Sequence, residues 1–344
     1  MTLICILINN LAKIIYFNEE VGLRTAVTSE RILFLIMDKG EHSIIQGIAP
    51  PYLKKGDKVA ITCPAKKLPK PMTDAIELLQ SWGLEVVLGE TLGLSFHQFA
   101  GDDDQRARDL QHFINDDSIK AIIAARGGYG TIRMIDKVDF SRLTQNPKWL
   151  VGFSDITILH THLYNNYHLQ SIHGQMPVNI PDASAKSLES LRKALFGEEI
   201  FYEFNSHALN RGGNAEGILI GGNLSLLAAV AGSVSDINYN NKILFIEDVG
   251  EYLYAIDRMI RTLDRAGKLK NLAGLIVGGF NEIKDNDIPF GQTIEQIVRD
   301  VVDKYDYPVC FDFPAGHVPD NRSLVLGRKI KMFVADAKVV INYS

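Results

Sequence analysis

The feature that most constrains the fold is a regular alternation of short apolar runs and helical patterns, which begins at Pro51. Short buried runs separated by helices are typical of a parallel sheet with helices on its faces. In the first half of the chain the expected strands are 58–63, 84–88, 119–125 and 149–153. The helices expected between and after them are 72–82, 102–115, 131–135 and 155–165. The pattern therefore predicts an α/β fold with a mainly parallel sheet.

The same alternation returns in the second half, after a polar, proline-containing stretch at 177–213. The expected strands are 217–222, 243–246, 273–277 and 309–311, and the expected helices are 224–231, 254–266 and 293–305. The tail 324–343 alternates apolar and polar residues, as half-exposed antiparallel strands do. We expect an amino-terminal α/β domain at 47–176, a linker at 177–213 and a smaller α/β domain at 214–344.

The composition bounds the class of protein and its partners. With 344 residues, 46% of them hydrophobic and 22% charged, the chain can bury a sizeable core. A formal net charge of -5 gives no sign of binding to nucleic acid or to an anionic membrane. Cys5, Cys63 and Cys310 are isolated in the sequence, so they predict no disulfide framework and fit a reducing compartment.

The first 46 residues lie outside this pattern. The apolar stretch 1–17 is interrupted by an Asn-Asn pair and no basic cluster precedes it, so it fits a signal peptide poorly. The apolar run 32–37 is too short to cross a bilayer. Three explanations are open: a poorly formed targeting segment, an appended structural element, or a misplaced start with Met37 as the true first residue. We favour the third, because the organised pattern begins only after this segment.

Ser154 lies directly between an expected strand and an expected helix. A serine in this position is held on a sharp turn with its hydroxyl exposed at the carboxyl end of the sheet. The N–H of Asp155, at the positive end of the helix, would then point at an acyl group under attack. Ile156 departs from the G-x-S-x-G pattern, and a serine that only caps a helix explains the position equally well.

The run Arg-Gly-Gly-Tyr-Gly at 126–130 follows an apolar strand and should meet Ser154 at the same edge of the sheet. It lacks the Lys-Ser/Thr of a phosphate loop and the spacing of a dinucleotide-binding loop. Gly128 is therefore a candidate for a second N–H donor to an oxyanion. A tight turn that needs positive φ explains the glycines as well, but it does not explain Arg126.

Glu247 and His317 complete a possible catalytic set. Glu247 ends an apolar strand, where a carboxylate needs a partner, and His317 lies in a turn-rich loop after a short strand. A serine nucleophile needs a base near neutrality, and the base needs an acceptor that fixes its tautomer. Glu251 is the rival acid on the same segment, and Glu247 is preferred because it directly follows the strand.

The remaining histidines do not indicate a metal site. His160 and His162 are two residues apart on an expected helix and so point to different faces, which is poor geometry for metal ligands. His173, followed by Gly174, is a candidate substrate-pocket residue. We therefore expect neither a metal nor a cofactor.

Several motifs occur in a fixed order over the chain from Pro50 to its end. They are Arg-Gly-Gly-Tyr-Gly at 126–130, Gly-Phe-Ser-Asp-Ile-Thr at 152–157, His-Gly at 173–174, Gly-Gly-Asn-Leu at 221–224, Glu-Asp-Val-Gly-Glu at 247–251, Ile-Asp-Arg-Met at 256–259 and Gly-His at 316–317. In order and spacing they resemble the LD-carboxypeptidase family. Two features depart from the family: Gln175 replaces the more usual proline after His-Gly, and the first 46 residues have no counterpart.

The resemblance implies a fold, an activity and a compartment. The family consists of cytoplasmic serine peptidases that remove the terminal D-alanine from murein tetrapeptide during cell-wall recycling, or cleave peptide-nucleotide antibiotics of the microcin C type. Its members pair an amino-terminal α/β domain with a smaller carboxyl-terminal one, and the active site lies in the cleft between them. They form homodimers, use no metal or cofactor, and act on small peptide-like substrates.

Residue by residue, the resemblance also implies catalytic roles. The implied catalytic residues are Ser154 as nucleophile, Glu247 as acid, His317 as base, and Gly128 and Asp155 as oxyanion donors. A carboxypeptidase must also bind a terminal carboxylate, and Arg126 and Arg258 are the candidates for that ion pair.

Two alternative functions stay open. One is an immunity-type peptidase that acts on acylated-nucleotide antibiotics. The other is a non-catalytic small-molecule binding module, since two α/β lobes with a cleft also describe many binding proteins. The binding module predicts no coupling between Ser154, Glu247 and His317, and the poor signal peptide counts against an exported protein of that kind.

Overall fold

The computed structural model describes residues 2–8, 11–17 and 46–343, which belong to two separate units. In the first unit, strand β1 (Thr2–Ile8) pairs antiparallel with β2 (Leu11–Phe17). The run 32–37 and the alternative start at Met37 lie outside the described residues. All the other elements belong to the second unit.

The first sheet of the second unit is parallel except at one edge. Its strand order is β13-β7-β6-β5-β3-β4. The parallel strands are β3 (Lys58–Thr62), β4 (Glu85–Leu88), β5 (Ile119–Ala124), β6 (Trp149–Gly152) and β7 (Ser171–His173), and β13 (Leu324–Leu326) pairs antiparallel with β7. Strands β5 and β6 are almost wholly buried, which explains their continuous apolar runs. The expected parallel sheet is confirmed.

The second sheet has the strand order β12-β11-β10-β9-β14-β15-β8. Its parallel strands are β9 (Gly213–Asn223), β10 (Lys242–Val249), β11 (Gly274–Asn281) and β12 (Val309–Cys310), and its antiparallel strands are β14 (Lys329–Val334), β15 (Lys338–Tyr343) and β8 (Phe201–Asn205). Strand β14 alternates buried and exposed residues, as expected for the tail. The start of the tail differs, because β13 is fully buried and belongs to the first sheet.

Helices cover both sheets. They are α2 (Thr73–Ser81), α3 (Asp103–Asn115), α4 (Thr131–Met134), α5 (Thr157–Tyr167), α6 (Ala185–Phe196), α7 (Leu224–Val230), α8 (Leu253–Arg265) and α9 (Ile294–Val302). Short 3-10 helices lie at Glu90–Gly93, Ile135–Lys137, Ser141–Thr144, Ser154–Ile156 and Pro177–Asp182. Within the described ranges, none of the helices has the length and apolar character that crossing a membrane requires. The expected two-part α/β architecture is confirmed.

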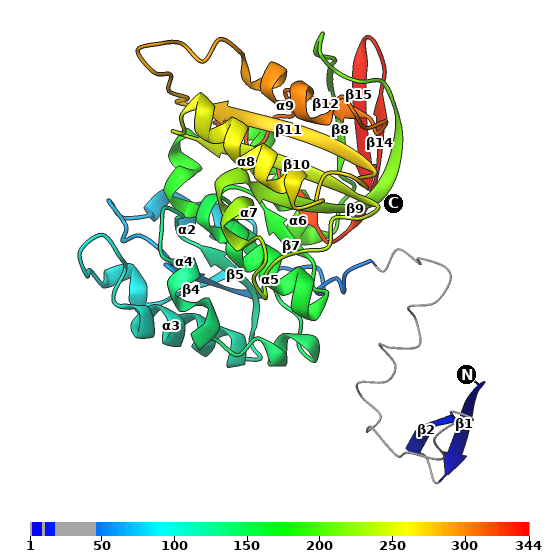
Figure 1. The fold of residues 1–344 in the computed structure, drawn as a ribbon. Coiled ribbons are helices and arrows are strands. Elements are labelled where there is room, and N and C mark those ends of the chain that lie inside the picture. The colour runs from blue at the N-terminus through cyan, green and yellow to red at the C-terminus, as the bar shows by residue number, and fades with distance from the viewer. Residues whose placement is uncertain (1, 9–10, 18–45, 344) are drawn as a thin grey trace. The chain divides into compact units, whose positions relative to one another are not determined.

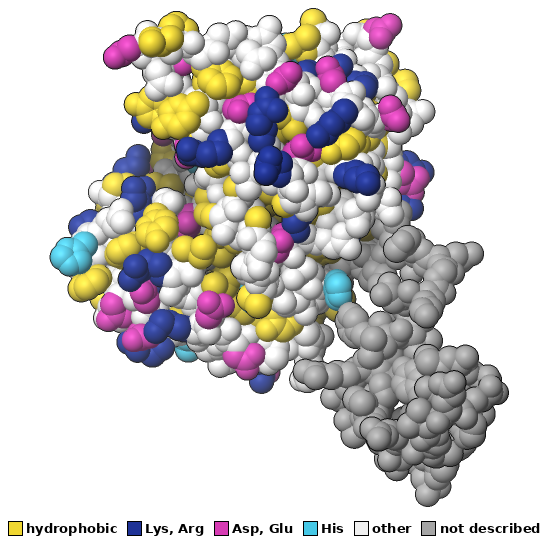
Figure 2. Space-filling model, viewed as in Figure 1, with side chains coloured by type: hydrophobic (Ala, Val, Ile, Leu, Met, Phe, Trp, Pro, Cys, Tyr) yellow, Lys and Arg dark blue, Asp and Glu magenta, His cyan; other side chains and the backbone are white. Residues whose placement is uncertain are grey.

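A shared core joins the two sheets. One buried apolar cluster includes Val151 and Ile172 from the first sheet together with Phe245 and Ile276 from the second. Helix α5 packs against α7 and β9, so the helix that follows Ser154 lies where the two sheets meet (Figure 1). On the face drawn in Figure 2, acidic and basic side chains are interspersed.

Gly221 in β9 provides a test of this packing. Its φ is +127°, and a Cβ there would lie 1.9 Å from the main-chain oxygen of Phe245 in β10. We expect Gly221→Ala to lower the free energy of unfolding by at least about 3 kcal/mol, because backbone strain and overpacking add. Gly232→Ala is the control: φ is +81° but nothing lies within 4 Å, so strain alone should cost about 1 kcal/mol. Urea denaturation followed by circular dichroism measures both, and equal losses would contradict the packing argument.

Candidate active site

Ser154 occupies a strained turn at the carboxyl end of β6. Its φ is +64°, a region that residues other than glycine rarely adopt. The turn continues as the 3-10 helix Ser154–Ile156 and leads into α5. The alternative expectation, a helix cap, is wrong: Ile156 occupies the N-cap of α5, and no side chain caps this helix. The helix itself starts at Thr157, two residues later than expected.

The glycine loop 126–130 lies against this turn. A Cβ on Gly127 would be 2.9 Å from the Cβ of Ser154, 3.1 Å from its Oγ and 3.3 Å from the main-chain nitrogen of Asp155. Only glycine permits that approach. Gly128 has a φ of +113°, and its missing Cβ would lie 2.5 Å from Cδ of Lys66. The paired glycines therefore serve both a close approach and a positive-φ turn.

Glu247 and His317 are hydrogen-bonded to each other. The Nδ1 of His317 lies 2.7 Å from Oε2 of Glu247, and the Glu247 side chain is fully buried whereas that of His317 is 20% exposed. Burial lowers the pKa of His317, but the hydrogen bond and the charge of Glu247 outweigh it, so that the pKa is raised above its ordinary value. The main-chain oxygen of Glu251, the rival acid, accepts a hydrogen bond from the N–H of Lys284. The geometry therefore pairs His317 with Glu247.

Phe153 connects the serine turn with the histidine. Its ring packs edge-on against His317 with the centroids 4.9 Å apart. On another side it meets His173 at 5.7 Å, and His173 in turn packs against Phe245 at 5.0 Å. His317 therefore lies beside the residue that directly precedes Ser154. Phe153 follows β6 of the first sheet, whereas His317 lies in the loop that leads from β12 of the second sheet to β13 of the first.

Asn223 is a site residue to which the sequence alone assigns no role. Its main-chain N–H donates to Oγ1 of Thr157 at 3.0 Å, and its Nδ2 donates to Oδ1 of Asp248 at 2.9 Å. Asn223 thus links the first turn of α5 to Asp248, the residue that follows Glu247. Burial, with the charge of Glu247, raises the pKa of Asp248 to about 6. The signal in the sequence was the glycine pair before Asn223, because a Cβ on Gly222 would lie 2.5 Å from Oγ1 of Thr157.

Of the other histidines that the sequence singled out, His160 and His173 are buried and His162 is half-buried. His173 is fully buried behind Phe153, so its side chain is closed to substrate in this conformation. His160 lies 2.9 Å from the main-chain oxygen of Gly152 through Nε2, and burial lowers its pKa to about 4. Its role is to hold the end of β6. His162 contacts Oγ of Ser235 through Nδ1 at 2.9 Å.

The candidate arginines have separate surroundings. Arg126 is half-buried and donates from Nη1 to the main-chain oxygen of Lys67 at 2.9 Å. Arg258 is exposed and lies over the ring of Tyr254 at 5.5 Å. Of the two, Arg126 belongs to the loop that contacts Ser154.

Cysteine or metal chemistry finds no support in the described residues. Cys63 and Cys310 are buried, and burial raises the pKa of both thiols, that of Cys63 to about 12. A thiol in such surroundings is a poor nucleophile. In residues 46–343 and the two strands before them, no group of three or more His, Cys, Asp or Glu side chains could hold a metal ion.

This geometry defines a class of protein: a two-part α/β hydrolase with a serine on a strained strand-to-helix turn beside a histidine-carboxylate pair. Comparison with known proteins gives the family. The LD-carboxypeptidase N-terminal domain matches residues 59–174, and the LD-carboxypeptidase C-terminal domain matches residues 216–332. The chain belongs to the LD-carboxypeptidase family and is a serine-type hydrolase, as the motifs indicate.

Individual relatives agree with this assignment. A probable murein peptide carboxypeptidase of Bacillus subtilis is 35% identical over 299 residues, covering 85% of this chain and 94% of the relative. The murein tetrapeptide carboxypeptidase of Pseudomonas aeruginosa is 28% identical over 285 residues, covering 79% and 91%. Muramoyltetrapeptide carboxypeptidase from Oxalobacter formigenes has a crystal structure that matches with a TM-score of 0.75 at 30% identity, covering 83% and 98%. MccF in complex with glutamyl sulfamoyl guanosine matches at 0.77, covering 87% and 99%, but its 20% identity indicates a shared fold alone.

The His317–Glu247 pair can be tested by titration. Because Glu247 raises the pKa of His317, we expect Glu247→Gln to lower it, which NMR of the imidazole resonances against pH measures. His160 is the internal control and should stay neutral between pH 5 and 8. The raised pKa also means that the pair stabilises the fold below the ordinary pKa of histidine, and that this contribution is lost as pH rises through the folded value. A His317 titration that is identical in both proteins would contradict the pairing.

Proposed function

We propose that this chain is a carboxypeptidase that removes the terminal D-alanine of murein tetrapeptide with a Ser154–His317–Glu247 triad. The observation that carries the proposal is the 2.7 Å His317–Glu247 contact beside the turn that bears Ser154. The strained φ of Ser154 supports it, because such strain is concentrated at functional sites.

The proposed reaction is acyl transfer. His317, held through Nδ1 by Glu247, takes the Ser154 proton with Nε2 as Oγ attacks the carbonyl of the L,D-peptide bond. The N–H groups of Asp155 and Gly128 stabilise the oxyanion. His317 then protonates the leaving D-alanine amine, and water, deprotonated by the same imidazole, releases the acyl group from Ser154. Glu247 stabilises the imidazolium in both halves of the reaction.

The names of the relatives favour murein peptides as substrates. The relatives at 35% and 28% identity are named for murein peptide and murein tetrapeptide, whereas the likeness to MccF rests on the fold. The hydrogen-bonded histidine beside Phe153, the residue that precedes Ser154, also weighs against a non-catalytic binding module, which has no need of such a pair. The family resemblance further leads us to propose a cytoplasmic homodimer, which cell fractionation and light scattering would test.

We place the terminal carboxylate of the substrate at Arg126 and Lys66. The stem of Lys66 is half-buried against Gly128, and Nε of Arg126 is buried without a partner. Among the described residues, neither cation has a carboxylate within ion-pair distance. Two uncompensated positive charges at the loop that touches Ser154 suit an anionic group of the substrate. From the sequence alone, Lys66 and its neighbour Lys67 were interpreted as a short basic patch of solvated surface, with no role in the site.

The reaction is tested with murein tetrapeptide. We expect the wild-type protein to release one D-alanine, detected by mass spectrometry, and Ser154→Ala to lose at least about 10³-fold in kcat while still binding the peptide. Ser81→Ala is the control, because the exposed Ser81 donates its Oγ–H to the main-chain oxygen of Leu78 within α2. Release by Ser154→Ala at the wild-type rate would eliminate the triad, and no release by wild type would eliminate this substrate.

The carboxylate contact is tested with two forms of the peptide. For the free acid, we expect Lys66→Met and Arg126→Met each to lower kcat/KM by about 10- to 100-fold, the range for a charged hydrogen bond. For the peptide amidated at its carboxyl terminus, the same variants should differ little from wild type. Lys67→Met is the matched control, since Nζ of Lys67 bonds to Oγ of Ser95 instead. If the preference for acid over amide survives in both variants, the assignment is wrong.

A further inference from the structure

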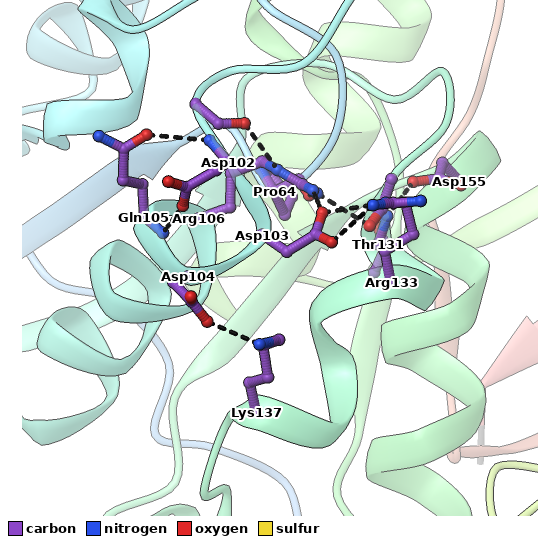
Figure 3. Close-up of polar contacts among 12 residues, drawn as sticks. Pro64, Asp102, Asp103, Asp104, Gln105, Arg106, Thr131, Arg133, Lys137 and Asp155 are labelled. Atoms are coloured by element: carbon purple, nitrogen blue, oxygen red, sulfur yellow. Dashed lines mark hydrogen bonds and ion pairs between the residues drawn. The ribbon is translucent and has the colours of Figure 1, made fainter. Parts of the chain in front are cut away.

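Arg106 in α3 is a fully buried cation. Its Nη1 donates to the main-chain oxygens of Pro64 at 2.7 Å and Gly130 at 2.8 Å, and its Nη2 pairs with Asp103 (Figure 3). The guanidinium lies 5.0 Å from the centroid of the Phe99 ring. Burying a charge is costly unless it is paired and hydrogen-bonded, so an arginine in this position has a specific task.

The two carbonyls belong to two different loops of the first sheet. Pro64 follows β3, and Gly130 is the last residue of the glycine loop that contacts Ser154. Gly130 has a φ of +147°, and a Cβ there would lie 2.7 Å from Nη1 of Arg106. Glycine is therefore what lets the guanidinium reach both carbonyls at once.

The peptide group between Gly130 and Thr131 is held at both ends. Its oxygen accepts from Arg106, and also from the main-chain N–H of Arg133 at 3.1 Å. Its N–H donates to Oδ2 of Asp155 at 2.8 Å. Because a peptide group is planar and rigid, a shift of its oxygen also moves the N–H that Asp155 accepts.

Asp155 completes the connection to the nucleophile. Its side chain is fully buried, its Oδ1 has no hydrogen-bond partner among the described residues, and its own main-chain N–H directly follows Ser154. Burial raises the pKa of this carboxyl group, and the hydrogen bond from the main-chain N–H of Thr131 and the charge of Arg106 oppose that shift. The Asp155 carboxyl group therefore depends on Arg106 for the position of its hydrogen-bond donor, the N–H of Thr131.

We infer that Arg106 is a positioning residue for the active site: through the Gly130–Thr131 peptide and Asp155, it aligns the glycine loop with the turn that bears Ser154. The inference rests on the proposed role of Ser154 as nucleophile. Arg106 does not touch the substrate, so its loss should act on the alignment of the oxyanion donors. Such a loss lowers kcat more than it raises KM, because the donors act mainly on charge that develops in the transition state.

Arg133 offers a matched control. It pairs with the same Asp103, at 2.8 Å through Nη2 (Figure 3). It also lies over the same Phe99 ring, 5.4 Å from the ring centroid. Its side chain is 47% exposed, and its bonds to Asp103 do not reach the loop carbonyls that Arg106 holds. The two arginines therefore share a carboxylate and a ring but differ in their connection to the site.

The experiment compares Arg106→Gln, Arg106→Lys and Arg133→Gln with wild type. Steady-state cleavage of murein tetrapeptide gives kcat and KM, and the rate of labelling by a fluorophosphonate reads the reactivity of Ser154 without any peptide. We expect Arg106→Gln to lower kcat and the labelling rate by about 100-fold with KM within about threefold. Arg106→Lys should lose about tenfold, because an ammonium lacks the planar fork. Arg133→Gln should stay within about twofold of wild type.

Circular dichroism and urea unfolding establish which variants are folded, and if Arg106→Gln is not, Arg106→Lys decides by the same criteria. A folded Arg106 variant with unchanged kcat and labelling overturns the inference, as does an equal loss in Arg133→Gln. So does a rise in KM at constant kcat. If wild type is labelled but does not cleave the tetrapeptide, the proposed substrate fails, and the labelling rates still decide the role of Arg106. If wild type is not labelled at Ser154, the nucleophile and this inference fall together.

Discussion

The hydrogen bonds of Asn223 connect the helix that follows Ser154 with the strand that carries Glu247. The position of the serine turn relative to the His317–Glu247 pair depends on this connection. Asn223 is almost fully buried. Its main-chain N–H donates to Thr157, and its side-chain amide donates to Asp248. Its Oδ1 accepts from the hydroxyl of Ser225 and from the main-chain N–H of Leu226. A slip of one sheet against the other would leave several of these groups unpaired, at a cost of about 1–3 kcal/mol for each. The helix that follows Ser154 and the strand that carries Glu247 are therefore held in one register.

Three buried carboxylates surround this connection, and each has a different partner. Glu247 accepts from His317, Asp248 accepts from Asn223 and the N–H of Ser225, and Asp155 accepts from Thr131. Burial raises the pKa of Asp248 and Asp155, whereas the negative charge of Glu247 raises that of His317. Hydrogen bonds in such surroundings are strong, and an unpaired group is correspondingly costly, so the site is rigid where the chemistry requires alignment.

Periodicity predicted the elements that are long and regular. The strand at 149–153, the helix at 254–266 and the parallel sheet are in the structure, with ends that differ by a residue or so. It missed β7, a three-residue strand too short to show a pattern, and the strand β8 within the stretch 177–213. The sequence also could not predict that β13 pairs with β7, because the apolar triplet Leu324–Leu326 does not indicate which sheet it joins.

The sequence by itself determined which residue types were available and where turns had to lie. The sequence alone was enough to identify the serine between strand and helix, the paired glycines, and the ordered motifs of the LD-carboxypeptidase family. Only the tertiary structure decided that His317 bonds to Glu247, 70 residues away, rather than leaving Glu251 as an alternative. It also decided that Arg106 is buried beneath the glycine loop while Arg133 is half-exposed. These outcomes depend on distances between segments far apart in the chain, and local periodicity carries no information about such distances.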